Sequence, residues 1–320
     1  MPFTFSHPAA VLPLRKYCPR YLNLVALMAG SIAPDLGYYL HNWHWSISGH
    51  SFLGSLSFDL PAGLMIVALF YLSIRPIARL LAHPHREALS SAFPVLSLPG
   101  LKSISIATVS VLLGAWTHII WDGFTHANGW CVRQFSAMTP TLFSISDYRI
   151  TLWHLLQHGS TIFGLIVLAQ AYNRYVHSKR FLRVKSLLGE KTRSAIWFLL
   201  LALPAVLAVQ QNLHHLQKGL SLPRLDNFIY NSTVTYVCCF LPILAAAAVA
   251  VSLLEYMASC LRKEEFPVIP EKIPQAEIPT PTLSASRIKA LAVSSSFGSS
   301  SKELLPLGVE PLSKHSNLID

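Results

Sequence analysis

The distribution of apolar residues along the chain predicts several membrane-spanning helices. Apolar runs close to the roughly 20 residues that a helix needs to cross a bilayer alternate with polar loops. The strong runs cover residues 56–74, 104–121, 195–213 and 234–257, and a moderate run covers residues 159–176. The pattern therefore predicts an all-α protein, a polytopic bundle of membrane helices.

Residues 21–40 form a sixth and weaker apolar run. Gly30 and the pair Pro34-Asp35 interrupt it, and a proline inside a helix breaks the ladder of backbone hydrogen bonds. Two arrangements follow from this. Either the segment completes a bundle of six spans, or it enters the membrane and turns back as a re-entrant N-terminal hairpin beside five spans.

The polar loops differ strongly in positive charge. Lys and Arg number four in residues 75–103, seven in 174–193 and two at 262–263, but none in 41–55 and two each in 122–158 and 214–233. Basic residues are enriched in cytoplasmic loops. With six spans, this asymmetry places the basic loops and both termini in the cytoplasm.

The chain changes character after the last apolar run. Residues 264–320 are rich in Pro, Ser, Glu and Lys, and such a segment buries too little apolar surface to offset the entropy lost on ordering. We therefore expect a membrane domain over residues 1–263 and a disordered cytoplasmic tail over residues 264–320.

Composition supports the membrane assignment and narrows the class of partner. Of the 320 residues, 52% are hydrophobic and 12% are charged, about half the charged fraction of a soluble domain, which argues against a soluble enzyme. The net charge of +10 is divided among loops between apolar runs. We therefore expect membrane lipid as the partner and no nucleic acid, and the sequence indicates no particular protein partner.

The fourteen histidines are unevenly distributed across the predicted membrane. Nine of them fall at or near the non-cytoplasmic ends of the runs, namely His41, His44, His50, His118, His126, His154, His158, His214 and His215. Ionisable groups near or within a membrane are costly and often mark functional sites, although interfacial histidines also occur with no such role. The distribution directs attention to this side.

The segment from His118 to His126 carries the clearest candidate chemistry. His118, Asp122 and His126 are spaced four residues apart, so a continuous helix would align them along one stripe. Imidazole nitrogen and carboxylate oxygen together suit a divalent ion such as zinc. A hydrogen bond between His118 and Asp122 at the helix end explains the same spacing, so the pattern leaves both interpretations open.

Two more segments are expected at the same membrane face. Asp35 follows Pro34 near the end of the first run, and His50 precedes the next run within Ser48-Gly49-His50-Ser51. Each motif is common when taken alone. Together they would bring a second carboxylate and a second imidazole to the pair His118 and Asp122.

These motifs resemble a known family. The opening Met1-Pro-Phe-Thr-Phe-Ser-His7-Pro, then Gly30-Ser-Ile-Ala-Pro-Asp35, His50-Ser-Phe-Leu-Gly and the His118–His126 segment are similar to an uncharacterised bacterial membrane family, domain-of-unknown-function family 4184. Their order also resembles, more distantly, the YdjM-type inner-membrane-associated metal-dependent hydrolases. The resemblance implies a bacterial inner-membrane protein with His7, Asp35, His50, His118 and Asp122 as metal ligands.

His7 fits that ligand set only in one of the two arrangements. If residues 21–40 cross the membrane, His7 lies on the cytoplasmic side, away from the other ligands. A re-entrant hairpin would return it to them. The related hydrolases also usually carry a Pro-Asp-x-Asp and a His-Arg motif, where this chain has Gly37 and Ile47-Ser48.

The preferred hypothesis is a membrane-embedded metal-dependent hydrolase that acts on a lipid or phosphoester at the non-cytoplasmic face. Asp35 and Asp122 would be ligands or the catalytic base. His126, or the pair His154 and His158, would support the ligands or bind a second metal ion. The alternative is a non-catalytic membrane protein, such as a carrier, a metal-handling protein or an assembly factor.

Overall fold

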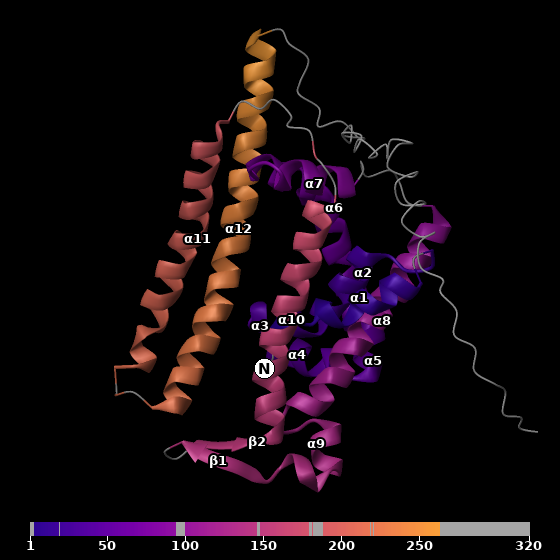
Figure 1. The fold of residues 1–320 in the computed structure, drawn as a ribbon, viewed down its shortest axis with the longest axis vertical. Helices are drawn as coiled ribbons and strands as arrows, with labels where there is room; N and C mark the ends of the chain where they lie inside the picture. The colour runs from indigo at the N-terminus through magenta and orange to yellow at the C-terminus, as the bar shows by residue number, and fades with distance from the viewer. Residues whose placement is uncertain are drawn as a thin grey trace, which may run out of the picture. The chain divides into compact units, whose positions relative to one another are not determined.

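The protein is a helical bundle that carries a short β hairpin (Figure 1). The computed structural model describes residues 3–18, 20–93, 100–145, 148–178, 181, 188–217, 219 and 221–262. The architecture confirms the predicted all-α class. The predicted tail, residues 264–320, lies outside the described residues, as do several basic residues of the predicted loop 174–193.

The elements follow one another in a simple order. The helices and strands are α1 (Pro8–Tyr17), α2 (Leu24–Ile32), α3 (Leu36–Tyr39), α4 (Trp43–Gly49), α5 (Phe52–Gly54), α6 (Leu60–Leu80), α7 (His85–Ala92), α8 (Leu101–Thr125), α9 (Trp130–Gln134), β1 (Thr141–Ile145), β2 (Tyr148–Thr151), α10 (Leu152–His177), α11 (Glu190–Asn212) and α12 (Leu222–Arg262). Short turns of 3-10 helix are η1 (Thr4–Ser6), η2 (Ala33–Asp35), η4 (Ser136–Met138) and η5 (Leu213–His215), and η3 (Ser55–Asp59) is a π-helical turn.

Within the described residues, five helical segments are long and apolar enough to cross a membrane. They are Phe52–Leu80, Leu101–Gln134, Leu152–His177, Glu190–His215 and Pro223–Ala258. Even the shortest has 26 residues, or about 39 Å at 1.5 Å per residue, against a hydrocarbon core of about 30 Å. These segments confirm the five predicted runs from 56–74 to 234–257.

Residues 21–40 do not form a sixth crossing of this kind. Helices α1 and α2 have 10 and 9 residues, about 15 Å each, and the chain then turns through η2 into α3. The backbone N–H of Asn23 donates to Ser110 Oγ at 2.9 Å, part-way along α8. The structure therefore supports five long helices with an N-terminal helical hairpin.

Helix α2 packs very closely against the middle of α8. A β-carbon on Gly30 would collide with the carbonyl oxygen of Val111, and one on Gly114 would collide with the carbonyl oxygen of Leu27. Small residues allow membrane helices to approach in this way, because van der Waals packing and polar contacts hold them together in an apolar solvent. The absence of two side chains thus fixes α2 beside α8.

Local capping explains where the shorter elements begin. The side chains of Asn23 and Asn42 accept hydrogen bonds from the backbone of Ala26 and Trp45, at the starts of α2 and α4. Thr151 and His154 form a reciprocal capping box at the start of α10. Polar side chains at these positions satisfy backbone N–H groups that have no partner within the helix.

The antiparallel hairpin β1–β2 was not predicted, and it falls in the polar loop 122–158. Its register pairs Thr141 with Thr151 and Ile145 with Tyr148.

The long helices run between two opposite ends of the bundle. One, here called the histidine end, holds His50, His118, His126 and His154, and the N-terminal segment joins it because the N–H of Phe3 donates to Thr161 Oγ1 of α10. The other, here called the basic end, holds Arg79, Arg86 and Arg193. There Arg79 pairs with Glu255 at 3.6 Å, and Trp197 Nε1 donates to the carbonyl of Leu80.

An apolar core lies between α6, α11 and α12. Its buried members are Leu80, Leu200, Leu244, Ala248 and Val251. A smaller cluster of Val11, Leu22 and Leu27 joins α1 to α2. The second cluster holds together the hairpin that positions the site described next.

Candidate metal centre

A buried cluster of two carboxylates and two imidazoles lies at the histidine end. Asp35, His50, His118 and Asp122 each present one ligand atom, and these four atoms lie within 4.8 Å of one another. Asp35 ends η2, His50 follows α4, and His118 and Asp122 lie one turn apart on α8. This group could hold a metal ion.

Each imidazole faces both carboxylates. His50 Nε2 lies 3.4 Å from Asp35 Oδ1 and 3.2 Å from Asp122 Oδ2. His118 Nε2 lies 3.5 Å from Asp35 Oδ1 and 3.3 Å from Asp122 Oδ2. The four side chains therefore alternate around a common centre.

The second ring nitrogen of each imidazole, Nδ1, is hydrogen-bonded to a backbone carbonyl. His118 Nδ1 is 2.8 Å from the carbonyl oxygen of Ser31, and His50 Nδ1 is 2.7 Å from that of Ser46. A carbonyl only accepts, so each Nδ1 carries the proton and donates it. In the neutral ring this leaves Nε2 as a lone-pair donor directed at the cluster, the arrangement typical of metal-ligating histidines.

Several atoms that face the centre have no hydrogen-bond partner in the described part of the chain. They include His118 Nε2 and Asp35 Oδ1, both buried. Asp122 Oδ1, which faces away from these two towards His7, is unpaired as well. Unpaired buried polar atoms are rare and costly. Carboxylate oxygens and unprotonated imidazole nitrogens both carry lone pairs, so a positive charge between them is favourable. Either a proton on an imidazole or a bound metal ion can provide that charge.

The N-terminal segment supports Asp35. Thr4 Oγ1 donates to Asp35 Oδ2 at 2.5 Å, and the hydroxyl of Tyr39 donates to Thr4 Oγ1 at 2.9 Å. Thr4 and Asp35 are both buried. Asp35 is therefore oriented by a chain of two hydroxyls that ends on its outward-facing oxygen.

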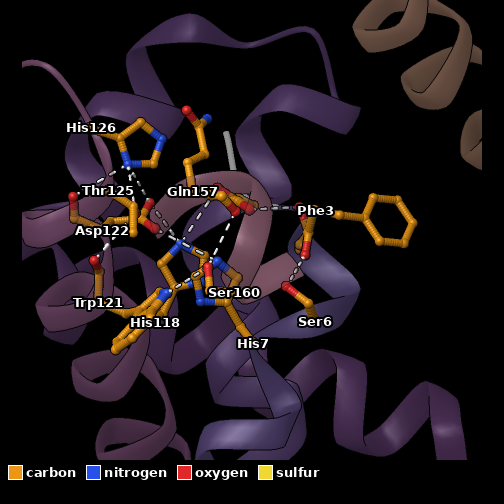
Figure 2. Close-up of polar contacts among 12 residues, drawn as sticks. Phe3, Ser6, His7, His118, Trp121, Asp122, Thr125, His126, Gln157 and Ser160 are labelled. Atoms are coloured by element: carbon orange, nitrogen blue, oxygen red, sulfur yellow. Dashed lines mark hydrogen bonds and ion pairs between the residues drawn. The ribbon is translucent and has the colours of Figure 1, made fainter. Parts of the chain in front are cut away.

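His7 reaches the same cluster from the start of the chain. Its ring stacks on that of His118 with centroids 3.8 Å apart, and its Nε2 lies 3.6 Å from Asp122 Oδ1 without a hydrogen-bond partner (Figure 2). His7 is adjacent to the four ligand atoms and is not one of that group. The N-terminal hairpin thus brings His7 to Asp122, which a crossing segment would not have done.

Protonation differs between the histidines of this cluster. Burial, together with the neighbouring His118, lowers the pKa of His7 to about 3. Burial would also lower the pKa of His50, but Asp122 and Asp35 outweigh it and raise that pKa to about 9. Burial would raise the pKa of the Asp35 carboxyl, yet His118 and His50 hold it well below its usual range. The two carboxylates thus favour a positive charge on His50, whereas the lowered pKa of His7 keeps its ring neutral.

The three further histidine candidates have different positions. Helix α8 ends at Thr125, so the predicted stripe stops before His126, but His126 Nδ1 still lies 3.5 Å from Asp122 Oδ2 (Figure 2). His154 Nδ1 faces Thr151 Oγ1 at 2.8 Å within the capping box. His154 and His158 line a cleft beside the cluster and are not members of the four-ligand group.

The sequence reasoning did not identify Asp59. This carboxylate is fully buried at the end of the π-helical turn η3, and neither oxygen has a hydrogen-bond partner among the described residues. It lies close to Gly49, the residue before His50. Its one sequence signal was a carboxylate inside the apolar run 56–74, a placement that often marks function.

A cleft of about 1010 Å³ opens onto the cluster. Its walls include His50 and Asp122 from the cluster, Trp130 from α9, Gln157 from α10 and Tyr230 from α12. A molecule in this cleft would therefore contact the ligand side chains directly.

A family model described as a domain of unknown function, DUF4184, matches residues 1–258. The chain belongs to this family. The match covers the N-terminal hairpin and the five long helices, so it includes every residue of the cluster. No curated protein and no solved structure matches this member of the DUF4184 family.

Proposed function

We propose that this protein is a membrane-embedded metal-dependent hydrolase whose metal is held by Asp35, His50, His118 and Asp122. The observation that carries the proposal is that Nδ1 of His50 and Nδ1 of His118 each donate a hydrogen bond to a backbone carbonyl. It leaves two Nε2 lone pairs and two carboxylates directed at one buried point, and a hydrogen-bonded helix end would not need this arrangement.

The donor set favours zinc. Two imidazole nitrogens with two carboxylate oxygens suit zinc, whereas calcium and magnesium prefer oxygen ligands alone. A divalent ion held there would act as a Lewis acid and make water nucleophilic near neutral pH.

The chain's own residues have distinct parts in this proposal. His50 and His118 bind through Nε2, and the carbonyls of Ser46 and Ser31 fix the orientation of their rings. Asp35 binds the metal through one carboxylate oxygen, while the hydroxyl of Thr4 donates to the other oxygen and orients the carboxylate. Asp122 contacts His7 and His126 as well as the cluster, so it is the candidate to accept a proton during hydrolysis.

The substrate in this proposal is a membrane lipid or phosphoester, and the site faces the non-cytoplasmic side of a bacterial inner membrane. Support comes from the five long helices and from the basic residues gathered at the opposite end of the bundle.

An odd number of crossings separates the termini, with the N-terminus on the outer side and the C-terminus in the cytoplasm. This revises the expectation of two cytoplasmic termini, which depended on a sixth crossing. The similarity to YdjM-type hydrolases stays an expectation from the sequence.

Metal content of detergent-purified protein tests the proposal. His118→Ala and Asp122→Asn should weaken metal binding by at least about 10- to 100-fold, the usual cost of removing even an outer partner of a ligand. Hydrolysis of a fluorogenic phosphodiester or lipid ester should fall in parallel. Asp226→Asn, which alters a carboxylate of the cleft outside the group, should keep its metal.

Two results would count against parts of the proposal. Unchanged metal content in both His118→Ala and Asp122→Asn would refute the shared site. A stoichiometric metal without turnover of any ester would instead support a non-catalytic, metal-handling protein.

A further inference from the structure

One cation stands out in the wall of the cleft. Arg133 of α9 is the only lysine or arginine among the described residues that line it, and it is exposed. Its guanidinium has no ion pair or hydrogen bond within the part of the chain that the structure describes. The guanidinium N–H groups of Arg133 are therefore free to bind a molecule in the cleft.

The corner between α8 and α9 brings Arg133 to this position. A β-carbon on Gly123 would collide with the indole of Trp130, and one on Gly129 would collide with the carbonyl oxygen of Gly123. These glycines let α9 return tightly against the end of α8, next to Asp122. The same corner therefore places the candidate metal ligand Asp122 and the unpaired cation Arg133 in the wall of one cleft.

The rest of the cleft is suited to an amphipathic molecule. Trp43, Trp130 and Trp153 line it together with Tyr38 and Tyr230. Trp and Tyr prefer the membrane interface, where one part of the ring is apolar and the other is hydrated. The volume of about 1010 Å³ lies at the upper limit for drug-sized ligands, so there is room for a headgroup and the start of its chains.

We propose that the cleft binds a lipid with an anionic phosphate headgroup and that Arg133 holds the phosphate. Arg presents a planar fork of N–H groups that pairs with phosphate in bidentate fashion. The aromatic wall would receive the glycerol and upper acyl chains. The inference rests on the proposed function, because it names the substrate class of the same site, but binding can be measured without turnover.

The test titrates full-length protein in an uncharged maltoside detergent with dioctanoyl phosphatidylglycerol, dioctanoylglycerol or inorganic phosphate. Tryptophan fluorescence reports binding, since three tryptophans line the cleft. Arg133→Ala should weaken phosphatidylglycerol binding by about 10- to 100-fold, the usual effect of losing hydrogen bonds to a charged group. Dioctanoylglycerol should bind weakly to wild type and Arg133→Ala alike.

Arg149→Ala is the matched control. Arg149 lies on β2 in the same predicted loop and does not line the cleft, so its loss should leave phosphatidylglycerol binding unchanged. Equal phosphatidylglycerol affinity in wild type and Arg133→Ala would overturn the inference. Inorganic phosphate that binds as tightly as phosphatidylglycerol would overturn its lipid part.

Repeating the titration after metal removal by a chelator separates this inference from the proposed function. Arg133-dependent phosphatidylglycerol binding should persist in metal-free protein. It would stand even if the variants of His118 and Asp122 showed no loss of hydrolysis.

Discussion

At the scale of single residues, the orientation of Asp35 depends on a hydroxyl from another part of the chain. Thr4 donates to the oxygen of Asp35 that faces away from the imidazoles, and Tyr39 in turn donates to Thr4. Outer partners of this kind orient ligands and tune their affinity for metal. Thr4 therefore belongs to the candidate site although it carries no ligand atom.

Replacing Thr4 tests this role. Thr4→Val keeps the shape of the side chain and removes the donor, so metal affinity should fall by about 10-fold or more. Thr4→Ser keeps the hydroxyl and should retain near-normal affinity. Isothermal titration with zinc would measure both variants, and equal affinities for Val and Ser at position 4 would exclude a role for this hydrogen bond.

At the scale of elements, the site requires α2 to lie against α8. The carbonyl of Ser31 on α2 orients His118 on α8, across 87 positions of sequence. The contact is possible because Gly30 and Gly114 leave no side chain between the two backbones. Packing of two helices therefore sets the tautomer of a ligand candidate.

Gly114→Ala should disturb both the packing and the site. The added methyl group would meet the backbone of α2, and overpacking of this kind typically costs about 1–3 kcal/mol. We expect a lower unfolding temperature by circular dichroism in detergent and weaker metal binding.

Gly159→Ala provides the control for that experiment. Gly159 is also inside a long helix, but a β-carbon there would meet nothing within 4 Å. Alanine should therefore leave stability unchanged or raise it by about 0.5–1 kcal/mol. A Gly114→Ala protein as stable as Gly159→Ala would contradict the close approach of α2 and α8.

At the scale of the whole molecule, the number of crossings decides which side each terminus occupies. The N-terminal segment joins the histidine end through Phe3 and His7. Helix α12 starts near that end, where Asp226 and Tyr230 line the same cleft as His50, and continues to Arg262. In the proposed topology, five crossings would put His7 and Arg262 on opposite sides of the membrane.

Labelling of single cysteines with a membrane-impermeant thiol reagent can test this topology in intact cells, in a background without native cysteines. Cysteines placed at residues 3, 136 and 144 should react from outside, whereas those at residues 85 and 190 should react only after permeabilisation. Protection of residue 3 with labelling of residue 136 would restore six crossings. Protection of residue 136 would place the histidine end in the cytoplasm.

The sequence by itself determined the helical class, the five crossing segments and the residue types of the candidate site. Length and hydropathy are local properties, so the runs from 56–74 to 234–257 already contained that information. Pro34 and Gly30 likewise marked residues 21–40 as irregular. The sequence alone left open whether that segment crosses, because the answer depends on what α2 packs against.

Only the tertiary structure decided the geometry of the cluster. The spacing of His118 and Asp122 fits a hydrogen bond as well as a shared ion, and the structure adds that the carbonyl of Ser31 occupies Nδ1 of His118, which directs Nε2 at the carboxylates. The opening motif included Thr4 without showing what it contacts, Asp59 was marked only as a carboxylate inside an apolar run, and His7 reaches Asp122 only because the N-terminal hairpin folds back. These contacts join parts of the chain that lie far apart in sequence, so they follow from helix packing and not from any local pattern.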